Sequence, residues 1–466
     1  MLEAGSTIVV DIGKTLSKVT LWTRDGRLLD RKTRPNATKL ADGLRRLDVD
    51  GIADWLPEAV RAYRGHPIET IVPVGHGAGV VALGEDAPAF APLDYEQPVP
   101  ADILEAYRAE RDGFSVTGSP ALPDGLNLGA QLYWLDRLYP QAMRAATLVP
   151  WAQYWAWFFA RGKVSEATSL GCHTDLWSPA DKTFSPLAKR MGWADRFAPI
   201  VGAGEVVGTL APTIAAACGL ERQVEVLAGL HDSNAALNAA RGFAAIGSGD
   251  ATVLSTGTWF IAMRMPADDA AASMPEDRDC LINVDVRGRP VPSARFMGGR
   301  EIETAVGLDT GRVDSKADQP GLLAAVPDVL RSDAMLLPTL APGCGPFPEG
   351  SGRWINRPEN GYARRAATCL YAALVTDRML DLIGARRCLL VEGRFAEAEV
   401  FVRALASLRP DMAVQTANAH NDVAFGALRL SDAGLVPHGR LATCPPLAVD
   451  LDSYRARWLS EVASAG

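Results

Sequence analysis

The chain has 466 residues, of which 48% are hydrophobic and 22% are charged, and it carries a formal net charge of -8. That length exceeds what one hydrophobic core usually supports, so we expect two domains. The acidic balance argues against a nucleic acid as the main partner, because phosphate binding usually shows as a basic surface. The 7 cysteines form no C-x-x-C pair, which favours reduced thiols in a cytosol over disulfides or a metal site.

The apolar pattern predicts neither an export signal nor a membrane span. The start of the chain lacks the basic and apolar run of a signal peptide. The most apolar stretch, 151–160, is too short to cross a bilayer, and we interpret it as a packed aromatic helix. We therefore expect a cytoplasmic protein with no membrane partner.

The first element in the chain is a predicted hairpin. Residues 8–10 and 19–22 are β-prone, and the turn between them reads Asp11-Ile-Gly13-Lys14-Thr15. A carboxylate, a glycine, a hydroxyl and the lysines Lys14 and Lys18 are the groups needed to hold a phosphate beside Mg²⁺. A Walker A loop is excluded, because Ile8 stands where that motif needs glycine and a strand follows instead of a helix. An ordinary turn with solvated lysines remains the alternative.

Several polar segments follow in the first half of the chain. Residues 69–74 read as a strand that ends in a glycine-rich turn, where Gly77 allows a ligand to approach the backbone. A plain surface turn explains this segment equally well. Asp94 lies in a polar turn and is able to bind a polyol. After a helix predicted around 128–138, the segment 166–175 is polar and aperiodic, so we expect a loop that carries His173 into a cleft.

A second candidate site lies where a predicted strand at 224–230 ends in His231 and Asp232. An alanine-rich helix follows and is closed by Gly242. Asp232 therefore stands between a strand and a helix, where it can face a cleft or simply cap the helix. The neighbouring histidine is equally consistent with a structural role.

The opening pattern recurs after the glycine-rich run 242–249, which we interpret as a domain junction. Residues 252–256 and 260–263 are β-prone and flank Gly257 and Thr258. Two such hairpins suggest an ancient duplication that holds phosphate from both sides. In the last third, helices and strands alternate, which predicts a mostly parallel sheet with Gly393 and the loop 418–421 near a nucleotide. No G-x-G-x-x-G follows any predicted strand, so a dinucleotide fold is not favoured.

Together these segments resemble the FGGY family of carbohydrate kinases over nearly the whole chain. The opening hairpin is similar to the first phosphate hairpin of the family, which implies that Asp11 serves Mg²⁺. Residues 229–232 resemble its catalytic motif, which makes Asp232 the general base, and residues 255–259 resemble its second phosphate hairpin. Trp259 and the segment 296–301 resemble the rhamnulokinase and fuculokinase branch of the family. Residues 337–343 resemble the interdomain segment.

The chain also departs from the family pattern. Lys14 stands where most members carry a small hydroxyl residue. Val391-Glu392-Gly393-Arg394 replaces the usual triple glycine of the adenosine segment, and its larger side chains narrow the approach to the nucleotide. Gln131 lies near the place where members often carry a lysine.

The resemblance implies an α/β fold of two actin-like (ribonuclease H-like) domains with an interdomain cleft: a sugar-binding domain at 1–241 and a nucleotide-binding domain at 242–466. We expect an ATP-dependent kinase that uses Mg²⁺ and Asp232 to phosphorylate a hydroxyl of a ketose of the L-rhamnulose, L-fuculose, xylulose or ribulose type. The alternatives are a catalytically silent binding relative and a kinase for a tetritol or glycerol. The expected partner is a small sugar, and a homodimer is left open. The predicted cofactor residues are Asp11, Gly13, Lys14, Thr15, Lys18, Thr256, Gly257, Thr258, Gly298, Gly393, Arg394 and Asn421. The predicted sugar residues are Gly77, Asp94, His173, His231 and Asp232.

Overall fold

The computed structural model describes residues 5–267, 274–307, 312–417 and 423–465. Contacts divide the chain into two compact units. Unit 1 comprises residues 1–242, 282–290 and 421–438, and unit 2 comprises 243–281, 291–420 and 439–466. Two short segments from the second half of the chain therefore belong to unit 1, which a single boundary at 241/242 does not capture.

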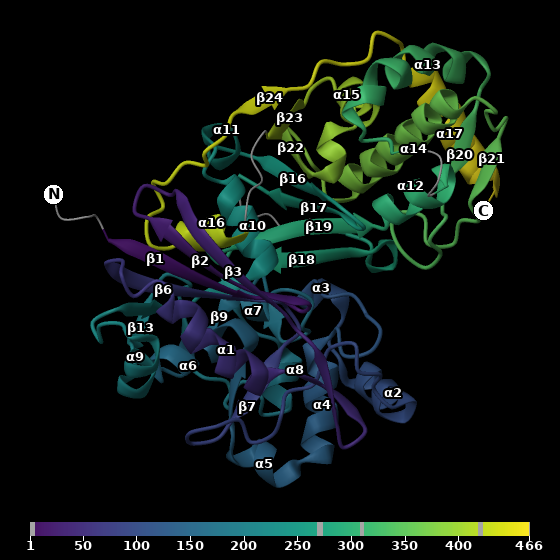
Figure 1. Cartoon of the computed structure of the whole chain (residues 1–466). Coiled ribbons are helices and arrows are strands. Elements are labelled where there is room, and N and C mark those ends of the chain that lie inside the picture. The colour runs from purple at the N-terminus through teal and green to yellow at the C-terminus, as the bar shows by residue number, and fades with distance from the viewer. Residues whose placement is uncertain (1–4, 268–273, 308–311, 418–422, 466) are drawn as a thin grey trace. The chain divides into compact units, whose positions relative to one another are not determined.

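Unit 1 is built on a 7-stranded mixed sheet (Figure 1). Strands β1 and β2 form the predicted opening hairpin, and β6 lies parallel to β1 on its other side. Along the sheet the strands are β13 (Val206–Thr209), β14 (Glu225–Leu227), β6 (Ile68–Gly75), β1 (Ser6–Ile12), β2 (Leu16–Thr23) and β3 (Leu28–Pro35), and β15 (Leu230–His231) pairs with β6.

Both faces of this sheet are buried at β1, where every residue is buried although successive side chains of a strand point to opposite faces. Ile8 and Val10 of β1 belong to one apolar core, and Val9 belongs to another. The first core contains side chains of α1 (Val49–Arg61), α6 (Trp151–Ala160) and α9 (Pro212–Cys218). The second contains side chains of α10 (Asp232–Ala240) and α16 (Val423–Leu428). This double burial explains why β1 is continuously apolar.

A third apolar core in unit 1 supports the segments that lead to His173. It is formed largely by α2 (Ala101–Glu110), α4 (Leu128–Leu138), α5 (Pro140–Ala145), α8 (Pro186–Arg190) and the hairpin of β7 (Val80–Leu83) with β8 (Thr147–Pro150). The predicted helices at 128–138 and 151–160 coincide with α4 and α6.

Unit 2 repeats the arrangement of unit 1 around the second predicted hairpin. The order of its sheet is β18 (Cys280–Val284), β19 (Pro290–Phe296), β17 (Phe260–Met265), β16 (Ala251–Thr256), β22 (Cys388–Gly393), β23 (Ala413–Ala417) and β24 (Leu441–Thr443). As in unit 1, the first strand pairs antiparallel with its hairpin partner and parallel with a later strand. Its main helices are α12 (Gly298–Val306), α13 (Gln319–Arg331), α14 (Gly361–Leu382), α15 (Glu399–Leu408) and α17 (Asp452–Ala465). The shared topology supports the predicted duplication.

Three local predictions need correction. The sheet of unit 2 is mixed, not mostly parallel, because β17, β19 and β24 each pair antiparallel with a neighbour. The strand predicted at 224–230 is divided, since Gly229 adopts φ +76° between β14 and β15. The segment 166–175 is not wholly a loop: Glu166 caps a short helix, α7 (Ala167–Leu170).

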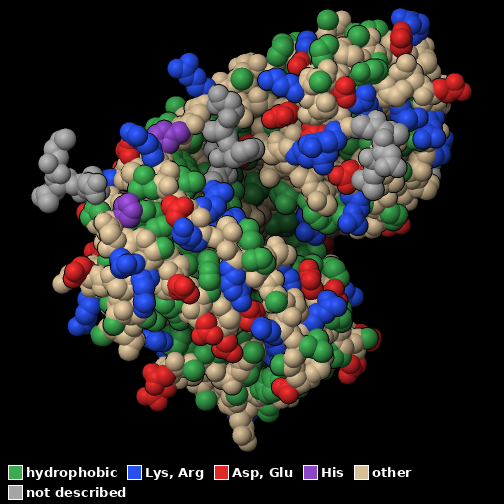
Figure 2. Space-filling model, in the orientation of Figure 1, with side chains coloured by type: hydrophobic (Ala, Val, Ile, Leu, Met, Phe, Trp, Pro, Cys, Tyr) green, Lys and Arg blue, Asp and Glu red, His purple; other side chains and the backbone are tan. Residues whose placement is uncertain are grey.

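The surface mixes both signs of charge. On the face shown in Figure 2, Lys and Arg side chains are interspersed with Asp and Glu over both units. In the part of the chain that the structure describes, no helix has the length and apolar character needed to cross a membrane.

Candidate active site

The turn of the first hairpin presents free backbone N–H groups. The N–H of Gly13 donates to the carbonyl of Leu16 at 3.1 Å and closes the turn. The N–H groups of Lys14 and Thr15 at the tip donate to none of the described residues. Asn36 clamps the turn from outside, because its Nδ2 donates to the Gly13 carbonyl at 2.8 Å. Successive free N–H groups in a turn form an anion-binding concavity.

Asp11 and Lys18 face each other across this hairpin. Asp11 is the penultimate residue of β1 and is 4% exposed, and its register partner on β2 is Lys18. The Lys18 Nζ donates to Asp11 Oδ2 at 2.9 Å. The pair places a carboxylate and an ammonium together below the tip of the turn, as the sequence predicts for a phosphate–metal site.

Lys14 is directed towards the predicted sugar residue Asp94. Its Nζ forms an ion pair with Asp94 Oδ2 and lies 3.4 Å from Glu96 Oε2. Thr38 Oγ1 also donates to Asp94 Oδ2, at 3.0 Å. Burial raises the pKa of Asp94, but the hydrogen bonds from Lys14 and the Glu96 N–H outweigh it and hold the pKa below its ordinary value. Asp94 is therefore a buried carboxylate that depends on Lys14 for its charge balance.

Asp232 is the first residue of α10 and not its cap. His231 occupies the cap position, and neither residue accepts the hydrogen bond that defines a side-chain cap. Asp232 Oδ1 accepts from the Ser233 N–H at 2.6 Å and lies 3.2 Å from His231 Nε2. Every contact that the described residues make with this carboxylate is to Oδ1, which leaves Oδ2 available. The capping alternative is therefore not supported.

The protonation states of His231 and Asp232 are suited to a general base at Asp232. Burial lowers the pKa of His231 to about 4, so its ring is neutral at pH 7. Its Nδ1 lies 3.3 Å from the Asn234 amide nitrogen, which donates, so the proton is on Nε2 and points to Asp232. Burial raises the pKa of Asp232 although its side chain is 32% exposed, and nearby His76 and Lys18 oppose that rise.

A buried hydrogen-bond network positions His231. The His231 N–H donates to Thr168 Oγ1 at 3.0 Å, and that hydroxyl donates to Glu166 Oε2 at 2.6 Å. Gly77 packs directly on the imidazole, since a Cβ there would lie 2.9 Å from His231 Nε2. The structure thus brings Gly77, His231 and Asp232 together, as the sequence predicts. Glu166 and Thr168 were not predicted, because only their polar, aperiodic pattern marks them.

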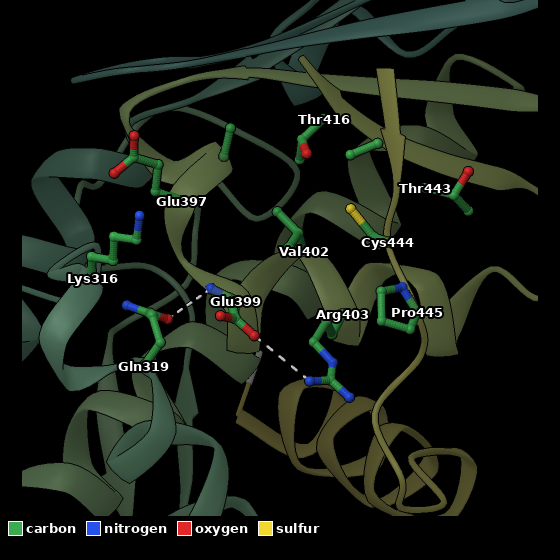
Figure 3. A pocket seen from close by; sticks show the side chains of 12 residues that line it. Lys316, Gln319, Glu397, Glu399, Val402, Arg403, Thr416, Thr443, Cys444 and Pro445 are labelled. Atoms are coloured by element: carbon green, nitrogen blue, oxygen red, sulfur yellow. Dashed lines mark hydrogen bonds and ion pairs between the residues drawn. The ribbon is translucent and has the colours of Figure 1, made fainter. Parts of the chain in front are cut away.

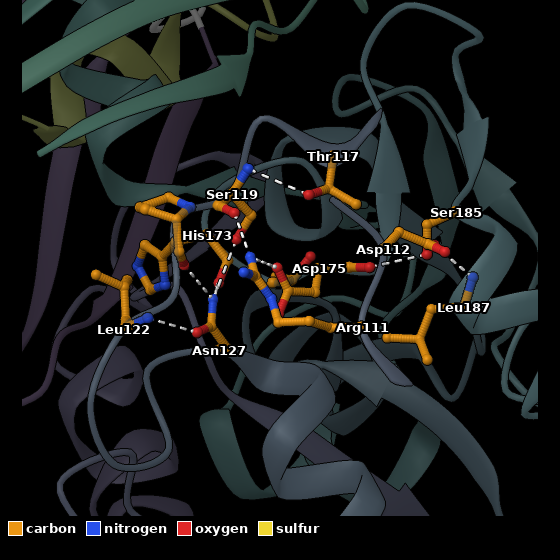
Figure 4. Close-up of polar contacts among 12 residues, drawn as sticks. Arg111, Asp112, Thr117, Ser119, Leu122, Asn127, His173, Asp175, Ser185 and Leu187 are labelled. Atoms are coloured by element: carbon orange, nitrogen blue, oxygen red, sulfur yellow. Dashed lines mark hydrogen bonds and ion pairs between the residues drawn. The ribbon is translucent and has the colours of Figure 1, made fainter. Parts of the chain in front are cut away.

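His173 belongs to a different network (Figure 4). Its Nδ1 hydrogen-bonds to the Leu126 carbonyl at 2.6 Å, and its own carbonyl accepts from Asn127 Nδ2 at 3.0 Å. Arg111 and Asp175 form a buried ion pair at 3.1 Å in the same region. The neighbouring Cys172 lies against Gly77, so His173 is near the site, but its ring nitrogen Nδ1 is engaged.

The second hairpin repeats the first in unit 2. The Gly257 N–H donates to the Trp259 carbonyl at 3.0 Å, and the N–H groups of Thr258 and Trp259 have no acceptor among the residues described. Thr256 Oγ1 accepts from the Phe395 N–H at 3.1 Å and ties the hairpin to the end of β22. Gly393 has φ +84°, and a Cβ there would lie 2.1 Å from the Thr256 carbonyl oxygen, so only glycine fits. Gly298 packs on the ring of Phe260 at the start of α12.

Arg394 is engaged by acidic side chains. Its Nε donates to Asp314 Oδ2 at 2.8 Å, and its Nη1 donates to Glu303 Oε1 at 3.0 Å. Despite partial burial, hydrogen bonds from Arg312 and Arg394 hold the pKa of Asp314 well below its usual range. A role for Arg394 with a nucleotide therefore stays a prediction, and Asn421 lies outside the described residues.

A cavity of about 390 Å³ lies next to this segment in unit 2 (Figure 3). Its lining combines Lys316 and Gln319 with Glu397, Arg403 and Cys444, and the Gln319 side chain accepts from the Glu399 N–H at 2.8 Å. Polar side chains in such a cavity can fix the orientation of a small ligand.

Asp11 fits a magnesium ion that arrives with a nucleotide. In the described ranges, no group of three or more His, Cys, Asp or Glu side chains is arranged to hold a metal. Mg²⁺ in kinases usually takes one or two carboxylates, substrate phosphates and water. A single buried carboxylate below a phosphate-type turn meets that requirement.

Comparisons with known proteins find similarity to carbohydrate kinases. The family described as "Carbohydrate kinase FGGY, C-terminal domain" matches residues 248–438. The L-fuculokinase of Escherichia coli K12 is 25% identical over 280 residues, which span 55% of this chain and 56% of that enzyme. The match thus covers a little over half the length of that relative.

Solved structures extend the likeness to the whole chain. A carbohydrate kinase from Novosphingobium aromaticivorans is 64% identical, with a TM-score of 0.98 and 100% of both chains covered. A xylulose kinase from Rhodospirillum rubrum is 17% identical, with a TM-score of 0.77 and 98% of each chain covered, which concerns the fold alone. The predicted fold class of two actin-like α/β domains is confirmed by these neighbours.

Proposed function

The chain belongs to the FGGY family of carbohydrate kinases, and from that premise we propose that it transfers the γ-phosphoryl group of ATP to a hydroxyl of a ketose. Phosphotransferases of this kind work mainly by positioning their substrates and neutralising charge, since phosphoryl transfer needs little covalent chemistry from the protein. The proposal has to account for three tasks: activating the hydroxyl, holding the phosphates and holding the sugar.

The observation that carries the proposal is the state of Asp232. A sugar hydroxyl is a weak nucleophile, so a base must accept its proton as the bond to phosphorus forms. Asp232 Oδ1 is engaged by the Ser233 N–H and His231, so Oδ2 would be the atom that takes that proton. A carboxyl whose pKa is raised by burial is a stronger base than one in water.

Each unit contributes one hairpin whose turn is suited to bind phosphate. The backbone N–H groups of Lys14 and Thr15 in unit 1, and those of Thr258 and Trp259 in unit 2, donate to none of the described residues. Lys18 adds a positive charge beside Asp11. Mg²⁺ held through Asp11 would neutralise charge on the phosphate oxygens. We assign the nucleotide base to the cavity lined by Lys316 and Glu397, because its lining also includes Ala396, three residues after Gly393.

The sugar would lie in unit 1 against Gly77, Asp94, His231 and Asp232. The L-fuculokinase relative and the segments around Trp259 and 296–301 favour a ketose of the L-rhamnulose, L-fuculose, xylulose or ribulose type over glycerol or a tetritol. A catalytically silent binding relative is the alternative from another class, and the enlarged side chains at Glu392 and Arg394 are the observation in its favour.

The test is a coupled assay of ADP release across a panel of ketopentoses, 6-deoxyketoses, tetritols and glycerol, with Mg²⁺ present or chelated. We expect one ketose to give the highest kcat/KM and the activity to vanish without Mg²⁺. Turnover of glycerol faster than every ketose would overturn the substrate class. Sugar and ATP binding without any ADP release would establish the silent relative.

A further inference from the structure

Another cavity in unit 2 lies away from the segment that the proposed function assigns to the nucleotide. Its volume is about 250 Å³, and its lining comes mainly from the loop before β22, the loop before β23 and helix α17. Because β22 and β23 are parallel, the starts of both strands lie at the same edge of the sheet. Arg387 directly precedes β22 and Gly393 ends it, so the two are about 20 Å apart along the strand. The cavity is therefore distinct from the nucleotide segment of unit 2.

The lining of this cavity is rich in arginine. It contains Arg386, Arg387, Arg409 and Arg455, with Asp411 as the carboxylate of the lining. The chain as a whole has a net charge of -8, so its general composition does not explain such a concentration of cations. Guanidinium groups bind carboxylate and phosphate oxygens through pairs of parallel N–H bonds.

Two of these arginines are explained by the fold. The side chain of Asp377 on α14 is buried, at 1% exposed. Arg409 Nε donates to Asp377 Oδ1 at 2.5 Å, and Arg455 Nη2 lies 2.8 Å from Asp377 Oδ2. Arg409 also pairs with Asp381 at 2.5 Å. A buried carboxylate is costly without such cations, so Arg409 and Arg455 stabilise unit 2.

The other two arginines have no comparable partner. The Arg386 side chain is 70% exposed, and its Nε lies 4.0 Å from Asp250 Oδ2. That carboxylate is already bound by Arg264, whose Nε and Nη2 donate to it at 3.0 and 2.5 Å. The guanidinium of Arg387 forms no hydrogen bond or ion pair with the described residues. Arg387 also has φ +65°, a backbone conformation that residues with long side chains seldom adopt.

We propose that this cavity binds a small phosphorylated anion, either a phosphate monoester or free phosphate, through the guanidinium groups of Arg386 and Arg387. The four lining arginines outnumber the three carboxylates of Asp377, Asp381 and Asp411 by one, so an anion meets net positive charge there. A terminal phosphate has three oxygens and up to two negative charges, which suit two adjacent guanidinium groups better than a carboxylate does. The volume lies below the roughly 300–1,000 Å³ of sites for drug-sized ligands, which favours a small anion.

The experiment is calorimetry of the full chain at low ionic strength with two probes, inorganic phosphate and glycerol 3-phosphate. The proteins are the parent, Arg386→Gln, Arg387→Gln and the matched control Arg222→Gln, at an exposed arginine of unit 1. We expect each of the two cavity variants to weaken binding about tenfold or more, because a charged hydrogen bond is lost, and the control to bind as the parent does. Tighter binding of glycerol 3-phosphate assigns the cavity to phosphate monoesters, and equal affinity assigns it to free phosphate. Either result supports the phosphate site.

Arg386 and Arg387 are exposed, so both variants should melt at nearly the temperature of the parent. Should Arg387→Gln fail to fold, Arg386→Gln provides the same test alone. Phosphate that binds only at the hairpins would be bound equally well by both variants, and this result would overturn the inference. Failure of the parent to bind either probe, or an equal loss in Arg222→Gln, would overturn it too. The inference does not depend on the proposed function, since it is tested by binding and needs no release of ADP.

Discussion

The ammonium of Lys18 lies 2.9 Å from Oδ2 of Asp11, and these two residues are directly opposite each other on β1 and β2. The Asp11 side chain is buried, at 4% exposed, and the ammonium compensates part of the cost of burying its carboxylate. A charged carboxylate below the phosphate-type turn is the condition for binding Mg²⁺ there.

We therefore predict that Asp11→Asn remains folded and loses most of its activity, while its requirement for Mg²⁺ rises. Asparagine is nearly isosteric and keeps one oxygen for Lys18, so stability should change little. Activity titrated against Mg²⁺ and thermal melting are the measurements, with Asp25→Asn in an exposed turn as the control. Unfolding of Asp11→Asn, with activity lost only in proportion, would assign Asp11 to the fold.

The second prediction concerns Lys14, which forms an ion pair with the predicted sugar residue Asp94. Lys14→Ser introduces the small hydroxyl type that most family members carry, and it leaves Asp94, at 1% exposed, without its cation. We expect KM for the sugar to rise about tenfold or more, while KM for ATP changes less.

Kinetics with each substrate varied in turn measure this split. Lys39→Ser is the control, because the Lys39 side chain is 59% exposed and lies 3.5 Å from its carboxylate partner Asp48. A larger effect on the ATP KM than on the sugar KM would show that Lys14 acts on the phosphates, as the sequence alone suggests.

Glu392 supplies a prediction about pH. Burial alone raises its pKa from 4.5 to about 8, and its Oε1 is buried without a partner among the described residues. A carboxyl that binds its proton more tightly in the folded state stabilises the fold below pH 4.5 relative to higher pH, and this stabilisation is lost as the pH rises through 8. Glu392→Gln should therefore melt at a higher temperature relative to the parent at pH 9 than at pH 5.

The control is Glu85→Gln, at an exposed position, which should shift melting equally at both pH values. If the melting difference between Glu392→Gln and the parent is the same at pH 5 and pH 9, the carboxyl is not titrating in this range.

The sequence predicted the parts of the fold that have a strong local signal. Helices α4 and α6 coincide with their predicted ranges because apolar runs with clear ends mark them. The hairpins were predicted because β-prone runs flank a glycine turn. The mixed sheet of unit 2 was not, since the pairing of β24 with β23 joins distant segments and has no local signature.

In the candidate site, too, only the residues with a local sequence signal could be predicted. Asp11, His231 and Asp232 lie at strand ends, which the sequence marks, and the structure places each beside a predicted neighbour. The support for His231 comes from Thr168, a contact across 63 positions that no periodicity reveals. The direction of Lys14 was equally beyond the sequence, because a long side chain can reach either the phosphates or Asp94.

The last prediction concerns Asp232 as the general base. Asp232→Asn keeps an oxygen that can accept from the Ser233 N–H, and the helix cap position belongs to His231, so the folded state loses little. The amide cannot accept the proton of a sugar hydroxyl. General base catalysis is typically worth about 10²–10⁴ in rate, so we expect kcat to fall by at least about 10² while sugar and ATP still bind.

Calorimetry of both ligands and the melting temperature accompany the rate measurement, with Asp452→Asn, in the first turn of α17, as the matched control. The pH dependence adds a second test. Burial raises the pKa of Asp232, so the parent kcat should fall as the pH drops through that pKa and the carboxylate is protonated. The residual rate of Asp232→Asn should lack this acidic limb. A folded Asp232→Asn protein with nearly normal turnover would remove Asp232 from the mechanism, because no amide can substitute for a base that the reaction needs.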